Sequence, residues 1–121
     1  MIEDYPVFGC GLGGYESAFE KFKTSAFDLA QDYAHNDYLQ YLAELGAAGF
    51  AIAGAFLILI GKRALRASRL ERDPPIRWIG LACAASLAAI LIHSAADFNL
   101  YVPANAILLA WICGLAAASN S

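Results

Sequence analysis

The sequence predicts an all-α integral membrane protein with three transmembrane helices, and three observations predict this class. Of the 121 residues, 60% are apolar and only 16% are charged, whereas about 25% of the residues of an ordinary soluble domain are charged. The apolar residues gather in three long runs. The charges lie before and between these runs, so little polar sequence remains to cover a soluble core.

Residues 1–44 are expected to form an extracytoplasmic segment. Residues 1–14 are irregular and rich in glycine, and residues 15–30 have the apolar spacing of a short amphipathic helix. Gly9, Gly11 and Gly14 match the glycine fingerprint of dinucleotide-binding proteins, but no strand precedes them. We therefore interpret them as a turn before a helix or a loop at the lipid interface. The acidic N-terminus has neither a basic nor an apolar region, so we expect no signal peptide.

A helix start precedes the first apolar run. Asp37 followed by Gln40 has the form of a capping box. The helix is expected to continue without a break into residues 45–61, an uncharged run that reaches about 25 Å at the helical rise per residue. A stripe of small residues in this run predicts close contact with other helices, from a second copy of the chain or from helices outside this sequence. The stripe consists of Gly46, Gly49, Ala53 and Gly54.

The rest of the chain is expected to hold a basic loop and two further transmembrane helices. Residues 62–77 contain six basic and two acidic residues and are expected to form a loop. Residues 78–96 are the second span, uncharged except for the titratable His93. After a short polar corner at 97–102, a third helix is expected over 103–118, with a proline in its first turn.

The charge distribution predicts the orientation in the membrane. Residues 1–44 have a net charge of −6, whereas residues 62–77 have a net charge of +4. The positive-inside rule then places the 62–77 loop in the cytoplasm. Residues 1–44 and the 97–102 corner share the opposite, periplasmic side, where they bring His35, His93 and Asp97 to one membrane face.

His35, Asn36 and Asp37 precede the helix that enters the membrane. A helix N-terminus favours a phosphate or a carboxylate, and a neutral histidine there is able to accept a proton from a hydroxyl nucleophile. The simpler interpretation is an interfacial polar cap, with Asn36 or Asp37 capping the helix. The spacing alone leaves both interpretations open.

His93 and Asp97 are four residues apart, which places them on one helix face near the end of the second span. Ionisable groups at membrane depth are candidates for function. A structural hydrogen bond between the two residues, closing the turn to the third helix, is the alternative interpretation.

Other partners and cofactors receive little support from the sequence. The scattered Cys10, Cys83 and Cys113 predict neither a disulfide framework nor a metal site. The basic residues form one short segment rather than a broad field, so no nucleic-acid partner is expected. We expect no cofactor.

Several of these segments together resemble the O-antigen ligase and O-antigen polymerase-like family of membrane proteins. The central pattern is His35, Asn36, nine residues, Gly46, two residues and Gly49. Matching segments lie upstream, at Phe8-Gly9-x-Gly11-x-Gly13, and downstream, at His93-Ser94-x-x-Asp97-Phe98-Asn99 with Pro103-Ala104-Asn105. The resemblance covers roughly residues 8–115.

The resemblance implies a multi-helix glycosyltransferase of the bacterial inner membrane, of which this chain matches the C-terminal part. Members of the family transfer a glycan from undecaprenyl diphosphate to an acceptor hydroxyl outside the cytoplasm, without a nucleotide sugar or a metal. His35 would be the catalytic base. Asn36 and Asp37 would orient the start of the helix, and His93 and Asp97 would support the site.

The chain departs from the family pattern in its cations. Family members are expected to hold the diphosphate with periplasmic arginines, but here no arginine precedes Arg63, and Lys21 and Lys23 are the only cations expected on the active face. We therefore expect the donor site on helices outside this sequence and no catalysis by these 121 residues alone. The alternative is a small non-catalytic membrane protein, a gene remnant or a helical partner of another membrane component; a weaker third interpretation is part of a transporter.

Overall fold

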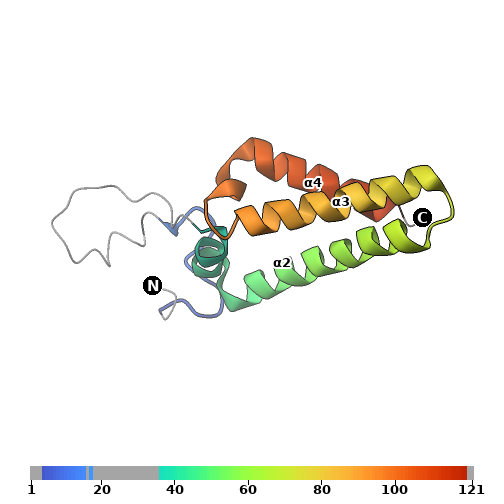
Figure 1. Ribbon diagram of the computed structural model, residues 1–121. Helices are drawn as coiled ribbons and strands as arrows, with labels where there is room; N and C mark the ends of the chain where they lie inside the picture. The colour runs from blue at the N-terminus through green and yellow to red at the C-terminus, as the bar shows by residue number, and fades with distance from the viewer. Residues whose placement is uncertain (1–3, 16, 18–35, 120–121) are drawn as a thin grey trace.

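The computed structural model describes residues 4–15, 17 and 36–119, and the regular secondary structure of this part is helical throughout (Figure 1). The predicted amphipathic helix over 15–30 therefore lies largely outside the described residues. The elements in chain order are helix α2 over Asp37–Leu70, helix α3 over Pro74–His93, a 3-10 turn η2 over Asn99–Tyr101, and helix α4 over Pro103–Ala118.

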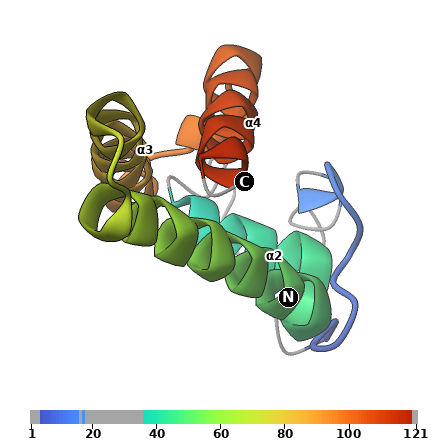
Figure 2. The same cartoon turned by 90° about the vertical axis from the view of Figure 1, so that its right-hand side faces the viewer.

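Helices α2 and α3 form an antiparallel hairpin, and α4 packs against both (Figures 1 and 2). A short turn at 71–73 joins α2 to α3 at one end of the bundle. At the other end the start of α2 lies beside the end of α3, η2 and the start of α4, and the glycine-rich N-terminal segment lies along α2 (Figures 1 and 2). We call this second end the polar end, because four buried polar side chains lie there.

The apolar core is a small cluster between the three helices. Alanine and cysteine contribute more of its buried side chains than large residues do, so the helices approach one another closely. Close packing of these side chains joins α4 to the hairpin. Its members are Ile60, Ala64, Cys83, Leu87, Ile112, Cys113 and Ala116.

Helices α2 and α3 are long and apolar enough to cross a membrane. Only 22% of the most apolar stretch of α2 and 17% of that of α3 are buried. Large side chains such as Ile52, Ile92 and Trp111 are more than two thirds exposed. A core helix of a soluble protein buries such residues, so these outer faces suit contact with lipid or with other helices. Helix α4 is apolar but shorter, with 16 residues.

The helix bounds correct two of the predicted ones. Helix α2 continues to Leu70 and α3 begins at Pro74, so most of the predicted 62–77 loop is helical. Lysine and arginine are good helix formers, and the helix ends only where the two prolines follow. Helix α3 ends at His93 rather than at residue 96. The third helix has its predicted bounds, with Pro103 in the first turn.

Helices α2 and α3 are in close contact at Gly80. A Cβ atom built at Gly80 would lie 2.7 Å from the Cβ of Ala67 and 2.9 Å from the carbonyl oxygen of Ala64. A Cβ built at Gly54 meets no described atom within 4 Å. The predicted stripe thus leaves room for a further helix at Gly54, whereas Gly80 is what allows the hairpin to close.

Gly80→Ala is expected to destabilise the hairpin, because the added methyl overlaps the α2 backbone. Overpacking of this kind costs about 1–3 kcal/mol. Thermal unfolding in detergent should therefore show a lower midpoint for this variant. Gly61→Ala is the matched control: it lies in α2 with open space around it, and alanine there should be neutral or stabilising because of its helix propensity. Equal midpoints for the two variants would contradict the packing at Gly80.

Candidate functional site

Helix α2 is broken at Gly46, near its start. Gly46 has φ 65° and ψ −176°, a conformation that residues other than glycine avoid. The predicted continuous helix from Asp37 through the apolar run is therefore wrong at this point. A break inside a helix leaves carbonyl groups free before it and N–H groups free after it, and buried groups of this kind need other partners.

The glycine-rich N-terminal segment, residues 6–13, supplies those partners. It lies along the break and forms two hydrogen bonds on each side of it. The first two satisfy carbonyls that precede Gly46, and the other two satisfy N–H groups that follow it. These bonds join Cys10 N to Ala43 O (3.0 Å), Gly11 N to Glu44 O (2.9 Å), Ala47 N to Pro6 O (2.9 Å) and Ala48 N to Val7 O (3.1 Å).

The contact between this segment and the break requires two glycines. A Cβ atom at Gly9, which has φ 69°, would lie 2.2 Å from the carbonyl oxygen of Glu44. A Cβ atom at Gly46 would lie 2.3 Å from the carbonyl oxygen of Val7. The two backbones therefore touch without intervening side chains. Gly9, the first glycine of the fingerprint, thus serves a close backbone contact with α2.

Glu44 connects three elements of the polar end: the N-terminal segment, α2 and η2. Its carboxylate is buried and accepts hydrogen bonds from the backbone N–H of Gly13 at 2.9 Å, from Nε2 of Gln40 at 3.5 Å and from the hydroxyl of Tyr101. The donors come from the N-terminal segment, from α2 and from η2. A buried carboxylate is tolerated when donors surround it in this way, so Glu44 fixes the relative positions of these elements.

The Tyr101 hydroxyl is held in its neutral form. Burial, the hydrogen bond to Glu44 and the charge of Glu44 together raise the pKa of Tyr101 well above its ordinary value. The ring also lies against Tyr41, with ring centroids 5.2 Å apart. The phenol therefore acts as a permanent hydrogen-bond donor to Glu44 at physiological pH.

Tyr101→Phe is expected to lower stability by about 1.5–3 kcal/mol, because a hydrogen bond to a charged group is lost. Since the folded pKa is raised, the contribution of Tyr101 is complete below about pH 10, where the unfolded phenol ionises. It decreases as the pH rises above that value. The difference between the unfolding midpoints of wild type and variant should thus be constant through neutral pH and shrink in strong alkali. A difference that grows with pH would contradict this account.

Asn36 and Asp37 fix the start of α2 to the end of α3. Asn36, and not Asp37, is the N-cap: its Oδ1 accepts from the N–H groups of Tyr38 (3.0 Å) and Leu39 (3.2 Å), and its Nδ2 donates to Ala95 O at 3.0 Å. The predicted capping box at Asp37 is therefore wrong, and the interpretation of Asn36 as the helix cap is confirmed. The backbone N–H of Asp37 donates to Ser94 O at 3.0 Å.

Asp37 is buried, with one of its carboxylate oxygens unpaired. Oδ2 accepts from the N–H of Leu100 at 3.0 Å, which ties η2 to α2. Oδ1 of Asp37 and the hydroxyl of Ser94 are buried without a hydrogen-bond partner. An unpaired buried oxygen lowers the free energy of unfolding by about 1–3 kcal/mol. These two atoms are therefore still able to form hydrogen bonds, whereas the other polar groups of the cluster already have partners.

The structure brings together only part of the predicted site. Asn36 and Asp37 lie in the cluster, whereas His35, Lys21 and Lys23 fall outside the described residues. Because α3 ends at His93, the helical spacing to Asp97 is lost. The His93 side chain is exposed, and Asp97 Oδ1 instead accepts from the N–H of Phe98 at 2.8 Å. The predicted hydrogen bond between these two residues is absent from the described part of the chain.

The sequence interpretation missed most of the cluster. Gln40 lies three residues after Asp37 and Glu44 lies four residues after Gln40, which places all three on one face of a helix. A polar stripe of this kind at the entrance to an apolar run was the available signal. Ser94 and Tyr101 carried no comparable local signal, because tertiary contacts alone bring them to the site.

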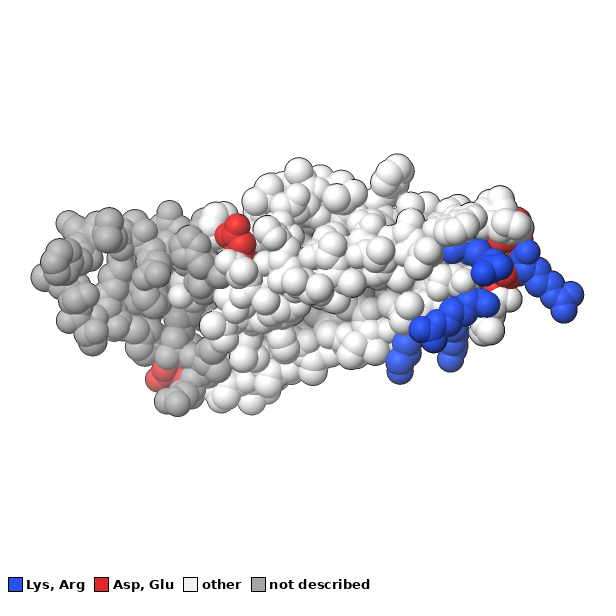
Figure 3. Space-filling view, in the orientation of Figure 1, with Lys and Arg blue, Asp and Glu red and all other residues white. Residues whose placement is uncertain are grey.

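The basic residues lie at one end of the bundle (Figure 3). Every lysine and arginine in the described ranges lies near the 71–73 turn, together with the acids Glu71 and Asp73. The buried acids Asp37 and Glu44 lie at the polar end. Within these ranges no group of three acidic, histidine or cysteine side chains is able to hold a metal ion. The described polar end thus offers hydrogen-bond acceptors and a helix start, but no cation for a diphosphate.

Comparisons of the chain with known protein families, with curated proteins and with solved structures found no match.

Proposed function

We propose that this chain forms the acceptor side of a membrane glycosyltransferase similar to O-antigen ligases and O-antigen polymerases. Such an enzyme transfers a glycan from undecaprenyl diphosphate to an acceptor hydroxyl at the outer face of the bacterial inner membrane. The proposal places α2 and α3 across the membrane, with the basic turn in the cytoplasm. The polar end and the N-terminal segment then face the periplasm.

One observation carries the proposal: the short segments that resemble the family are far apart in sequence but meet at the polar end. Gly9 contacts the α2 break at Gly46. Asn36 is bonded to Ala95, two residues after the end of α3, and η2 is bonded to Asp37. The matching segments span about 100 residues of sequence. If each segment stabilised only its own loop, the segments would not need to lie together in the folded chain.

In the proposed reaction the acceptor hydroxyl attacks the anomeric carbon of the lipid-linked glycan. The bond from that carbon to the diphosphate breaks, and undecaprenyl diphosphate leaves. His35 accepts the proton of the hydroxyl. Asn36 and Asp37 hold the start of α2 beside it, and the unpaired Asp37 Oδ1 and Ser94 hydroxyl are able to bond sugar hydroxyls when the site opens. The diphosphate is held by cations outside the described residues.

A non-catalytic helical partner is the second candidate. The exposed apolar faces of α2, α3 and α4 favour it, because they suit contact with further helices. The described polar end also has no lysine or arginine. A protein that does not bind a diphosphate needs no cation there. The two candidates differ in whether the complete gene restores glycan transfer.

Complementation distinguishes the two functions. The complete gene that contains this chain is expressed in strains that lack either the O-antigen ligase or the O-antigen polymerase. Restored surface glycan in one strain is expected from the transferase. A stably inserted protein that restores neither strain contradicts the transferase proposal and favours the helical partner.

A further inference from the structure

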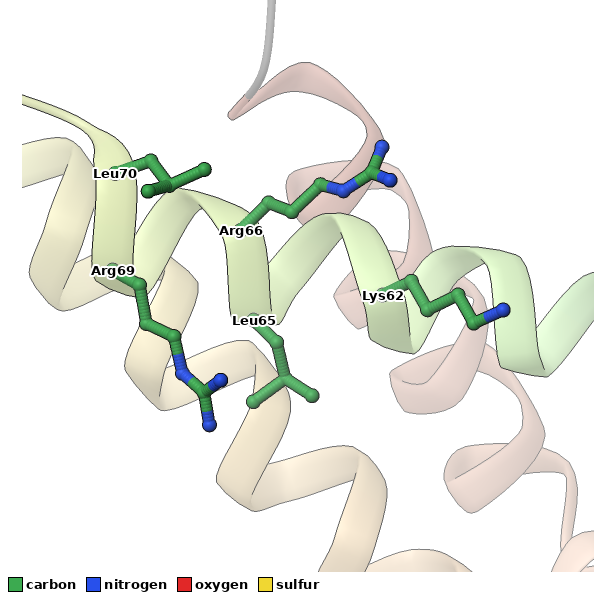
Figure 4. Close-up of a pocket in the computed structure, with 5 residues that line it drawn as sticks. All are labelled: Lys62, Leu65, Arg66, Arg69 and Leu70. Atoms are coloured by element: carbon green, nitrogen blue, oxygen red, sulfur yellow. The ribbon is translucent and has the colours of Figure 1, made fainter.

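A hollow on the surface of α2, near its basic end, is not used by the proposed reaction (Figure 4). Lys62, Arg66 and Arg69 line it together with Leu65 and Leu70. The three basic residues are spaced by four and three residues, so they lie along one face of the helix. All five side chains are exposed. The hollow therefore combines three cations with an aliphatic surface.

The cations of the hollow are not neutralised by the described residues of the chain. Lys62, Arg66 and Arg69 form no ion pair with any residue of the described ranges. Glu71 and Asp73, in the adjacent turn, are the nearest acids in sequence. Three unpaired cations on one helix face attract an anion far more strongly than a single surface lysine does.

The hollow lies where the apolar part of α2 ends. Leu59, on the apolar side of Lys62, is 62% exposed, and Leu70 is 75% exposed. On α3, Trp78 lies at the same end of the bundle and is 69% exposed, as is typical of an aromatic side chain at a membrane interface. A ligand bound in the hollow therefore contacts cations with its anionic group and apolar side chains with its apolar part.

We propose that this hollow binds the phosphate headgroup of an anionic phospholipid of the cytoplasmic leaflet. The phosphodiester would lie among Lys62, Arg66 and Arg69, and the acyl chains would run past Leu65 toward the exposed Leu59, on the apolar side of Lys62. Charge complementarity and the adjoining apolar surface together select a lipid over a soluble anion. The inference rests on the membrane location in the proposed function, but not on the transferase reaction.

The test compares two double variants of the purified protein in detergent, with short-chain phosphatidylglycerol as the probe. Arg66→Ala/Arg69→Ala removes two cations from the hollow, and Arg72→Ala/Arg77→Ala removes the same charge from the same end outside it. The first is expected to bind phosphatidylglycerol about tenfold or more weakly than wild type, and the control within about threefold of it. Arg66→Lys/Arg69→Lys should retain most of the binding.

Two further probes identify the ligand, and a folding check accompanies them. Short-chain phosphatidylcholine should bind much more weakly than phosphatidylglycerol, and inorganic phosphate should not compete. Equal losses in the two alanine variants would overturn the site, because binding would then depend on total charge. Competition by inorganic phosphate would overturn the lipid assignment. Unfolding midpoints exclude misfolding, and because no glycan transfer is measured, failure here leaves the transferase proposal standing.

Discussion

Gly46→Ala is expected to detach the N-terminal segment from α2 and to destabilise the polar end. A residue other than glycine in this conformation costs about 1–3 kcal/mol. The added Cβ would also lie 2.3 Å from a backbone oxygen of Val7, which is unable to move without breaking its bond to Ala48. The four hydrogen bonds across the break would be lost together, at about 1 kcal/mol each.

The thiol of Cys10 reports on this detachment. Cys10 lies in the docked segment and is half-buried, and burial together with the Glu44 charge raises the pKa of its thiol. The thiolate is the reactive form, so a maleimide should label Cys10 slowly in the wild type and severalfold faster in Gly46→Ala. Gly54→Ala, in open space on the same helix, is the control. Unchanged labelling in the Gly46 variant would contradict the docked arrangement.

His35→Ala is expected to reduce glycan transfer by about 100-fold or more in the complete protein, because general bases contribute about 10²–10⁴ to the rate. The effect should fall on turnover rather than on membrane insertion. His93→Ala is the matched variant: its side chain is exposed and has no bond to the described cluster, so we expect most of the transfer to remain. Full transfer by His35→Ala would remove the proposed base from the mechanism.

Local signals predicted the ends of the helices where prolines or an amide side chain determine them. Pro103 marks the start of α4 where it was expected. Asn36 caps the start of α2, one residue before the cap of the predicted capping box. The charge of the basic residues between 62 and 70 favours a loop, but the structure has a helix there. Helix propensity, which favours lysine and arginine, extends α2 until the prolines stop it.

The break at Gly46 was not predictable from its own surroundings. A glycine in an apolar helical run normally indicates helix packing. Here its role depends on Gly9 and the carbonyl of Val7, nearly 40 residues away, which reach it only in the folded chain. For the same reason Tyr101 was not recognised as the partner of Glu44.

The proposed reaction makes one product that no structural role would make: free undecaprenyl diphosphate, released in step with glycan transfer. Membranes containing the complete protein, supplied with lipid-linked glycan and acceptor, are assayed for both products. We predict equimolar release and transfer in the wild type, with both lost in His35→Ala. Transfer absent from the wild-type protein, or unaffected by the His35 substitution, would contradict the proposed function.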